Sequence, residues 1–178
     1  MVDVTEARRN VQEEEVSYRA AVSEGTWFKI GASLNFINKR QFDTHNFMLN
    51  GPYNSGLLGT GLDGMYVFQF DCEIVGISAF NLVAGTSGTT TFDCHWLNGS
   101  GSDQGSIFSV KPSIDYTAGN NAYLSTNIID ATSSGGTGLT IPTLSKTQFD
   151  QYDALRMDLD ASQVRAENCG LLIHFRPR

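Results

Sequence analysis

The sequence CEIVGISAFNLVAGTSGTTTFDCHWL, at residues 72–97, decides the fold class of this chain. Its middle, AGTSG at 84–88, has the composition of a turn, and the runs on both sides are rich in β-branched and aromatic residues. In the second run Phe92, Cys94 and Trp96 recur at every second position, which places them on one face of a strand. The stretch therefore predicts β-structure on each side of a turn.

Strand signals also precede and follow this stretch. Residues 65–70 (MYVFQF) and the run that starts at Cys72 predict a strand pair or one long, kinked strand. After a loop at 98–105 comes the strand SIFSV, which Pro112 ends or keeps at a sheet edge. The remaining strands are expected near residues 122–130, 139–149, 154–161 and 170–176. Roughly eight strands at this spacing predict an all-β fold, an antiparallel β-sandwich of jelly-roll type.

The expected strand at 154–161 has the cleanest alternation. Apolar residues occupy one face and charged residues the other: Leu155, Met157, Leu159 and Ala161 against Arg156, Asp158 and Asp160. The pattern predicts a half-buried strand whose acidic face is solvated and discourages unwanted strand pairing. Leu159 is expected to point into the core, as are Phe92 and Phe108.

The first 64 residues lack the regular strand pattern of the rest of the chain. Residues 3–24 form the only convincing helix, because Asp3 and Glu6 have capping-box spacing and Gly25 stands where a helix would end. The apolar stripe of this helix is thin, so it needs a partner surface. We therefore expect a helical anchoring arm at 1–24, an extended arm at 25–64 that is aromatic and then glycine-rich, and a β-sandwich domain at 65–178. The residues expected to anchor the chain are Val4, Ala7, Val11, Tyr18, Ala21, Trp27 and Phe28.

The charge of the chain argues against nucleic acid as a partner. Charged residues make up 17% of the 178 residues, and the formal net charge is −7. Binding to phosphates requires clustered Lys and Arg, and a short pair such as Arg8–Arg9 is not such a cluster. The N-terminus lacks the apolar core of a signal peptide, and no run approaches the roughly 18 apolar residues of a membrane span. We expect no membrane contact, and synthesis in the cytoplasm of a host.

Candidate catalytic and metal clusters are incomplete. Asp93 and His95 share one face of a strand, but His174 would have to arrive by strand pairing to complete a metal site. The aspartates of 150–160 lack the spacing of a calcium loop, and neither a paired-carboxylate motif nor GxSxG is present. We therefore expect no catalytic residue, no cofactor and no metal.

Three cysteines lie inside strand-like runs: Cys72, Cys94 and Cys169. An odd number without CxxC spacing argues against a disulfide framework or a zinc site. Buried, reduced thiols are expected, and the alternative is that two of the three face each other across strands.

Residues 72–116 also carry turn signals at a defined spacing. These are a hairpin of Ala84, Gly85, Thr86 and Gly88, a turn at Asn98–Gly99, and a closing pattern of Ile107, Phe108, Pro112 and Ile114. By this pattern the chain resembles a module of tailed-phage virion proteins, which are decoration, tail or head-fibre proteins. The resemblance covers about residues 65–178, including 149–160, where Tyr152 replaces the usual glycine, and the last strand at 170–178. It implies a trimer-prone β-sandwich on a particle.

A bacteriophage virion structural protein is therefore the expected function. The leading hypothesis is a capsid decoration (cement or head-fibre) protein, a homotrimer that docks through its N-terminal arm on the major capsid protein or another virion protein. A tail or neck fibre or adaptor is the alternative within this class, and a glycan-binding host-adhesion module is the alternative from another. Sugars would stack on Trp27, Trp96 or Tyr123, although packing in a core or an interface is the commoner role of such residues.

Removal of residues 1–24 is expected to leave the β-domain folded and to abolish attachment to the particle, because the apolar stripe is too thin to form part of the core. Circular dichroism and thermal denaturation report folding, and binding to particles that lack this protein reports attachment. A truncated protein that still saturates such particles, or one that does not fold, would contradict this assignment.

Overall fold

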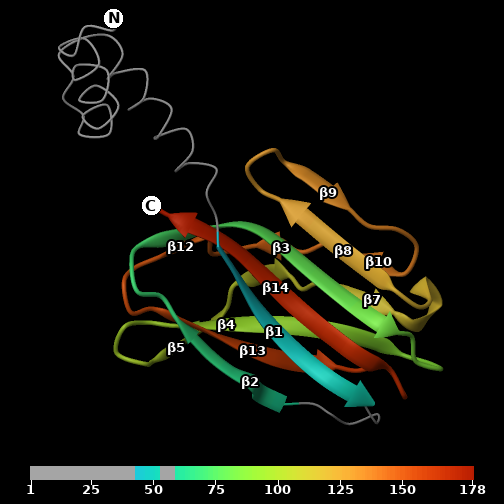
Figure 1. The fold of residues 1–178 in the computed structure, drawn as a ribbon. Coiled ribbons are helices and arrows are strands. Elements are labelled where there is room, and N and C mark those ends of the chain that lie inside the picture. The colour runs from blue at the N-terminus through green and yellow to red at the C-terminus, as the bar shows by residue number, and fades with distance from the viewer. Residues whose placement is uncertain (1–42, 53–58) are drawn as a thin grey trace, which may run out of the picture. The chain divides into compact units, whose positions relative to one another are not determined.

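The computed structural model describes residues 43–52 and 59–178, and the regular secondary structure of this part of the chain is almost entirely strand (Figure 1). The strands are β1 (Asp43–Pro52), β2 (Gly59–Val67), β3 (Cys72–Val83), β4 (Thr89–Leu97), β5 (Asp103–Ser106), β6 (Phe108–Val110), β7 (Ser113–Asp115), β8 (Ala122–Asn127), β9 (Thr132–Ser134), β10 (Leu139–Thr140), β11 (Thr143–Leu144), β12 (Gln148–Phe149), β13 (Ala154–Ala161) and β14 (Glu167–Pro177). The one helical element in these ranges is a 3-10 turn, η1 (Tyr116–Ala118). No helix among the described residues is long and apolar enough to cross a membrane. The helix expected at 3–24 lies outside them.

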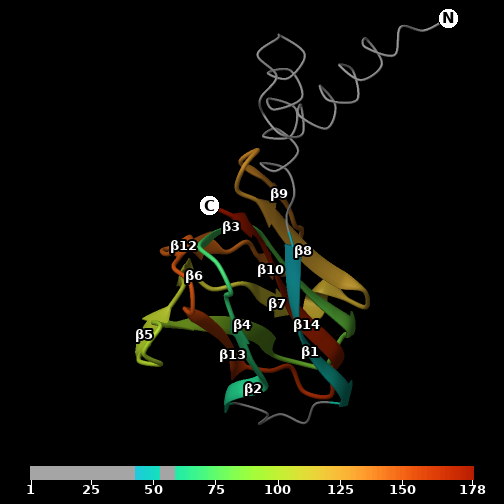
Figure 2. The same ribbon diagram turned by 60° about the vertical axis from the view of Figure 1, so that its left-hand side comes forward.

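The strands form two sheets, which we call sheet A and sheet B. Sheet A has the order β1-β14-β3-β8-β9, with β12 beside β3, and sheet B has the order β10-β7-β4-β13-β2, with β5 beside β4. Strands β6 and β11 form a separate pair. Figures 1 and 2 show the two sheets as two layers. Every described pair is antiparallel, which confirms the predicted all-β, antiparallel class.

The hydrophobic core lies between the sheets, because its buried side chains come from both. Phe68, directly after β2, joins them: its ring centroid lies 5.1 Å from that of Phe149 and 5.2 Å from that of Phe175, both in sheet A. The side chains predicted to point inward are Phe92, Phe108 and Leu159, which are 0%, 6% and 2% exposed. The prediction is confirmed, and burial of each such side chain stabilises the fold by about 1.5–3 kcal/mol.

Strand β13 has the predicted bounds, residues 154–161. Its exposure pattern differs from the prediction at one charged residue, Asp158. Leu155, Met157 and Leu159 are buried, and Asp160 is exposed. Asp158, however, is only 4% exposed, so the prediction of a solvated side chain is wrong for this residue. The carboxylate tolerates burial because it is hydrogen-bonded and paired with a cation, as described below.

The turn at 84–88 connects the two sheets and does not form a hairpin. Strand β3 belongs to sheet A and β4 to sheet B, so the predicted hairpin of Ala84, Gly85, Thr86 and Gly88 is wrong. For the same reason β2 and β3 are neither a strand pair nor one kinked strand, since β2 lies in sheet B. The turn residues predicted where the chain changes direction, but the strands that pair with β2 and β3 are distant in sequence.

A second connection between the sheets, at 162–166, holds the turn at 84–88. The amide of Gly85 donates a hydrogen bond to Oε1 of the fully buried Gln163 (2.7 Å). The backbone of Val164 exchanges two further hydrogen bonds with the turn (2.9 and 3.0 Å). A Cβ atom at Gly85 would lie 2.5 Å from the carbonyl oxygen of Val164. The two crossings therefore lie in direct contact, and glycine is required there.

Strands β1 and β2 extend the domain beyond its predicted boundary at residue 65. Strand β1 pairs with β14 from Asp43 onward, β2 pairs with β13, and the compact unit begins at Asp43. Residues 43–52 and 59–64, which were expected to belong to an extended arm and a glycine-rich loop, are strands of sheets A and B. Their alternation is too patchy, and their glycine content too high, to predict this from sequence.

All three cysteines are buried and in the reduced form, as predicted. Burial raises the pKa of the Cys72 thiol to about 12 and raises that of Cys94 well above its ordinary value. The thiolate is the reactive form, so Cys72 and Cys94 are unreactive at neutral pH.

The substitution Gly85→Ala is expected to lower the free energy of unfolding by about 1–3 kcal/mol, because the added methyl group overlaps a backbone oxygen that the second crossing holds in place. Gly136→Ala is the matched control, since its Cβ would meet nothing within 4 Å. Urea denaturation of both variants measures the difference. Equal stability of the two would show that the crossings do not pack as described.

Candidate functional site

The residues predicted to anchor the chain lie outside the described residues. They are Val4, Ala7, Val11, Tyr18, Ala21, Trp27 and Phe28. The site must therefore be sought on the two outer faces of the β-domain, for which the sequence offered a candidate metal cluster and candidate sugar-stacking residues.

The candidate metal cluster does not assemble. Asp93 and His95 lie on β4 in sheet B, whereas His174 lies on β14 in sheet A, where it bonds Thr44 and Ser78. No group of three or more His, Cys, Asp or Glu residues in the described ranges has the arrangement of a metal site. The convergence considered for these three residues is therefore wrong.

The outer face of sheet B instead carries a network of charged side chains, which we call the charged cluster. Its members are Asp93, His95, Asp103, Lys111, Arg156, Asp158 and Asp160. Strand register places Asp158 directly opposite Asp93, and both side chains are nearly buried, at 5% and 2% exposure. Two adjacent buried carboxylates are costly unless each is paired and hydrogen-bonded.

Each of the two buried carboxylates has its own cation. Lys111 Nζ lies 2.6 Å from Asp93 Oδ2, and the guanidinium of Arg156 binds both oxygens of Asp158 (2.9 and 2.8 Å). The amide of Gly61 donates a further hydrogen bond to Asp158 (2.9 Å), and Ser106 donates one to Asp93. The buried acids are thus neutralised in place, which gives them a structural role in joining β4 and β13.

Two pKa values show how this pairing acts. Burial by itself raises the pKa of Asp93, but hydrogen bonds from Lys111, Ser106 and the Cys94 amide, with the Lys111 charge, hold it below its ordinary value. Hydrogen bonds to Asp160 and Asp93 raise the pKa of Lys111. Asp93 is therefore ionised and Lys111 protonated at neutral pH, and because both pKa values are shifted away from 7, neither group changes its protonation state there.

The outer face of sheet A carries almost no charge. By register, its outward side chains are Thr44, Asn46 and Met48 on β1, Leu172, His174 and Arg176 on β14, Glu73, Ser78, Phe80 and Leu82 on β3, and Tyr123, Ser125 and Asn127 on β8. The two charged members, Glu73 and Arg176, bind each other at one end of the face (2.6 Å). We call the remainder the neutral face.

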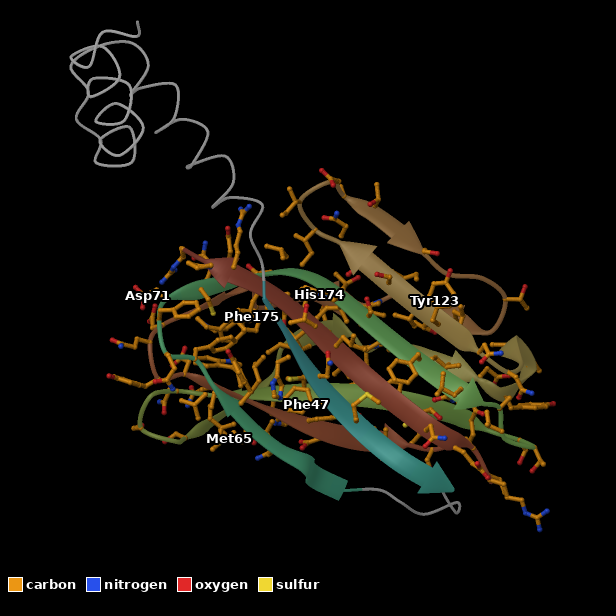
Figure 3. The ribbon with its side chains drawn as sticks, in the orientation of Figure 1. Phe47, Met65, Asp71, Tyr123, His174 and Phe175 are labelled. Carbon is orange, nitrogen blue, oxygen red and sulfur yellow. The ribbon has the colours of Figure 1, made fainter. Side chains whose placement is uncertain are left out.

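His174, labelled on β14 in Figure 3, lies in a diagonal row of hydrogen-bonded polar side chains that runs from β1 to β8. Its Nδ1 lies 2.8 Å from the hydroxyl of Thr44 and its Nε2 lies 3.1 Å from that of Ser78, which in turn lies 2.9 Å from the hydroxyl of Ser125. Burial lowers the pKa of His174, so the ring is uncharged at pH 7. The row satisfies its hydrogen bonds without adding charge to the face.

The adjacent row of the neutral face is apolar. Register aligns Met48, Gly170, Phe80 and Tyr123 across β1, β14, β3 and β8. The ring of Phe80 covers Gly170, where a Cβ would lie 2.8 Å from two ring carbons. Tyr123 is 62% exposed and Leu82 is 45% exposed. Clustered apolar exposure of this kind marks an interaction surface more often than a solvated one.

The three residues considered for stacking on sugars have different surroundings. Trp96 is partly buried, lies edge-on to Phe149, and has the ammonium of Lys146 4.0 Å above its ring. Tyr123 is exposed on the neutral face, and Trp27 lies outside the described residues. Trp96 therefore packs on the core, which is the role that the sequence analysis gave as the commoner one for such residues.

Comparisons with known proteins identify no family. No protein-family model and no curated protein matches the chain. Among solved structures, the SPBc2 prophage-derived protein YomS is 12% identical, with 75% of this chain and 95% of that chain covered and a TM-score of 0.31. A chain of the cyanophage Pam1 capsid is 8% identical (78% and 84% covered, TM-score 0.37), and a CocE/NonD family hydrolase from Staphylococcus aureus is 11% identical (76% and 31% covered, TM-score 0.33). These TM-scores lie below 0.5 and carry no argument about function.

Lys111→Met is expected to lower the free energy of unfolding at pH 7 by about 1–3 kcal/mol, because Asp93 then keeps a buried charge without its cation. The pKa of Asp93 is depressed by folding, so its stabilisation is present above the ordinary value of 3.8 and is lost as the pH falls through the lower folded value. The deficit of the variant therefore shrinks below about pH 4.

Urea denaturation between pH 2 and 8 measures this dependence. Asp160→Asn is the control, because it removes the exposed partner of Lys111 and leaves the buried pair intact; an exposed pair contributes about 0–1 kcal/mol. A deficit that does not change with pH would contradict the assigned role of Asp93.

Proposed function

We propose that this chain is a bacteriophage virion structural protein, a capsid decoration (cement or head-fibre) protein that assembles as a homotrimer and docks through its N-terminal arm. The observation that carries this proposal is the neutral face: a four-stranded outer surface without net charge on a chain whose formal net charge is −7. The resemblance of residues 65–178 to a module of tailed-phage virion proteins supports the same class.

A second copy of the same chain is the occupant that the neutral face fits. Copies of an acidic protein repel each other, and like charges across an interface cost several kcal/mol. The outer face of sheet B has four aspartates against one lysine and one arginine, so self-contact there would be repulsive. Contact through the neutral face avoids this cost and buries the apolar row that includes Phe80 and Tyr123.

We further propose that the fold is a jelly roll, as expected from the number of strands. Without the end strands β9 and β10, the side strands β5 and β12 and the separate pair β6–β11, the sheet orders become β1-β14-β3-β8 and β2-β13-β4-β7. If these eight strands are numbered in chain order, the orders are 1-8-3-6 and 2-7-4-5. This alternation between two four-stranded sheets supports a jelly roll, an architecture of viral capsid proteins.

The N-terminal arm is the proposed link to the particle. Its thin apolar stripe, with Val4, Val11 and Tyr18, requires a partner surface, and the major capsid protein or another virion protein would supply it. In this proposal the protein is located in the virion and is not an enzyme. A tail or neck fibre or adaptor remains the alternative, and copy number per particle separates them: hundreds of copies indicate decoration, and a handful indicate a fibre.

Tyr123→Asp with Leu82→Asp is expected to convert the trimer into monomers, raising the dissociation constant by more than about 100-fold, because each interface would bury unpaired charges. Both side chains are exposed, so the fold tolerates the change. Met65→Asp, 54% exposed on β2 of sheet B, is the control and should remain trimeric. Light scattering after size exclusion measures the mass. A monomeric wild type, or a trimeric double variant, would overturn the proposal.

A further inference from the structure

The tip of the β8–β9 hairpin carries two exposed isoleucines. Ile128 and Ile129, which are 40% and 47% exposed, directly follow Asn127, the last residue of β8. Tight turns are ordinarily built from Gly, Pro, Asn, Asp and Ser, each of which suits a turn for a physical reason of its own. Scattered exposed apolar residues are ordinary, but this adjacent pair places apolar surface where a turn usually has polar residues.

Hydrogen bonds from Asn127 hold the tip in a defined conformation. Its Oδ1 accepts the amides of Ile129 (3.0 Å) and Asp130 (3.2 Å), and its Nδ2 donates to a carboxylate oxygen of Asp130 (2.9 Å). The amide of Ile128 donates to the carbonyl of Val75 on β3 (2.9 Å), which attaches the tip to sheet A. The two apolar side chains are therefore presented on a preorganised backbone, so that little conformational entropy is lost when a partner binds them.

The tip lies at the end of the domain where the chain enters it. Asp43, the first residue of β1, pairs with Phe175, which pairs with Ile74 on β3. Ile128 bonds to the next residue, Val75, so Asp43 and Ile128 lie at one level of sheet A. The strands β14 and β3 lie between β1 and β8, so the two residues are about 15 Å apart across the sheet. Figures 1 and 2 both show the start of β1, the C-terminus and the hairpin tip at the same end.

We propose that Ile128 and Ile129 form a second contact with the virion protein that the N-terminal arm binds. The inference rests on the proposed function, because it takes docking through residues 1–24 as given. A partner bound by the arm is tethered to the domain at Asp43, at the same level of the sheet as the tip. Tethering makes the second contact intramolecular, so a small apolar contact that is too weak by itself adds to the affinity of the arm.

An apolar pocket on a protein is the environment that the tip fits. Isoleucine has no polar group in its side chain and a restricted χ1, so it fills a preformed apolar pocket at little entropic cost. The polar groups of Asn127 and Asp130 are engaged with each other and with the backbone of the tip. The tip sequence, NIIDA at 127–131, contains no Lys or Arg, which a surface of anionic lipid would require.

The double substitution Ile128→Ser with Ile129→Ser is expected to weaken binding of the full-length protein to particles that lack it by about 10-fold or more, because the apolar contact is lost. Serine is common in turns, so the hairpin and the trimer mass should be retained. Cosedimentation over a range of protein concentrations measures binding, thermal denaturation measures folding, and light scattering measures mass. Ile128→Val with Ile129→Val keeps the apolar surface and should bind within about threefold of wild type.

Val110→Ser is the matched control, because Val110 is similarly exposed (42%) on β6, outside sheet A, and should bind as wild type does. Should the double serine variant not fold, Ile129→Ser alone, at the more exposed position, takes its place with the same expected direction. Binding equal to that of wild type overturns the inference and leaves the proposed function intact. A change in trimer mass also overturns it, because the tip would then contact a second copy. Wild-type protein that does not bind the particles overturns the proposed function, and the inference with it.

Discussion

The insertion of the last two strands between earlier ones is the constraint on which both sheets depend. Strand β14 lies between β1 and β3, and β13 lies between β2 and β4. Neither sheet is complete until the C-terminal quarter of the chain is in place, so nearly all pairing is between distant segments and loop-closure entropy opposes it. The crossings at 84–88 and 162–166 hydrogen-bond to each other, which couples the placement of β14 in sheet A to that of β13 in sheet B.

The outer faces of sheets A and B satisfy their polar and charged groups in different ways. On sheet B, the buried carboxylates of Asp93 and Asp158 are held by Lys111 and Arg156, and the excess of acid keeps this face solvated. On sheet A, hydroxyls and an uncharged His174 satisfy each other's hydrogen bonds, so the face stays neutral beside its apolar row. An acidic protein with one neutral face can associate in a defined orientation, since the other face resists contact.

Local sequence determined the all-β class, the bounds of some strands and several of the core positions. Alternation alone set the bounds of β13 and the inward direction of Phe92, Phe108 and Leu159, because a period of two is a property of the strand itself.

Tertiary structure alone decided which strands are neighbours, because most pairs join segments that are distant in the chain, more than 100 residues apart for β1 and β14. The strand order places His174 and Asp93 in different sheets, and it makes the turn at 84–88 a connection between sheets where the sequence predicted a hairpin. It also buries Asp158 against the guanidinium of Arg156 and the amide of Gly61, and local alternation does not predict the Gly61 contact. The sequence showed Tyr152 where glycine is usual, but only the hydrogen bonds of the surrounding loops revealed that its backbone is held at positive φ while its ring faces solvent.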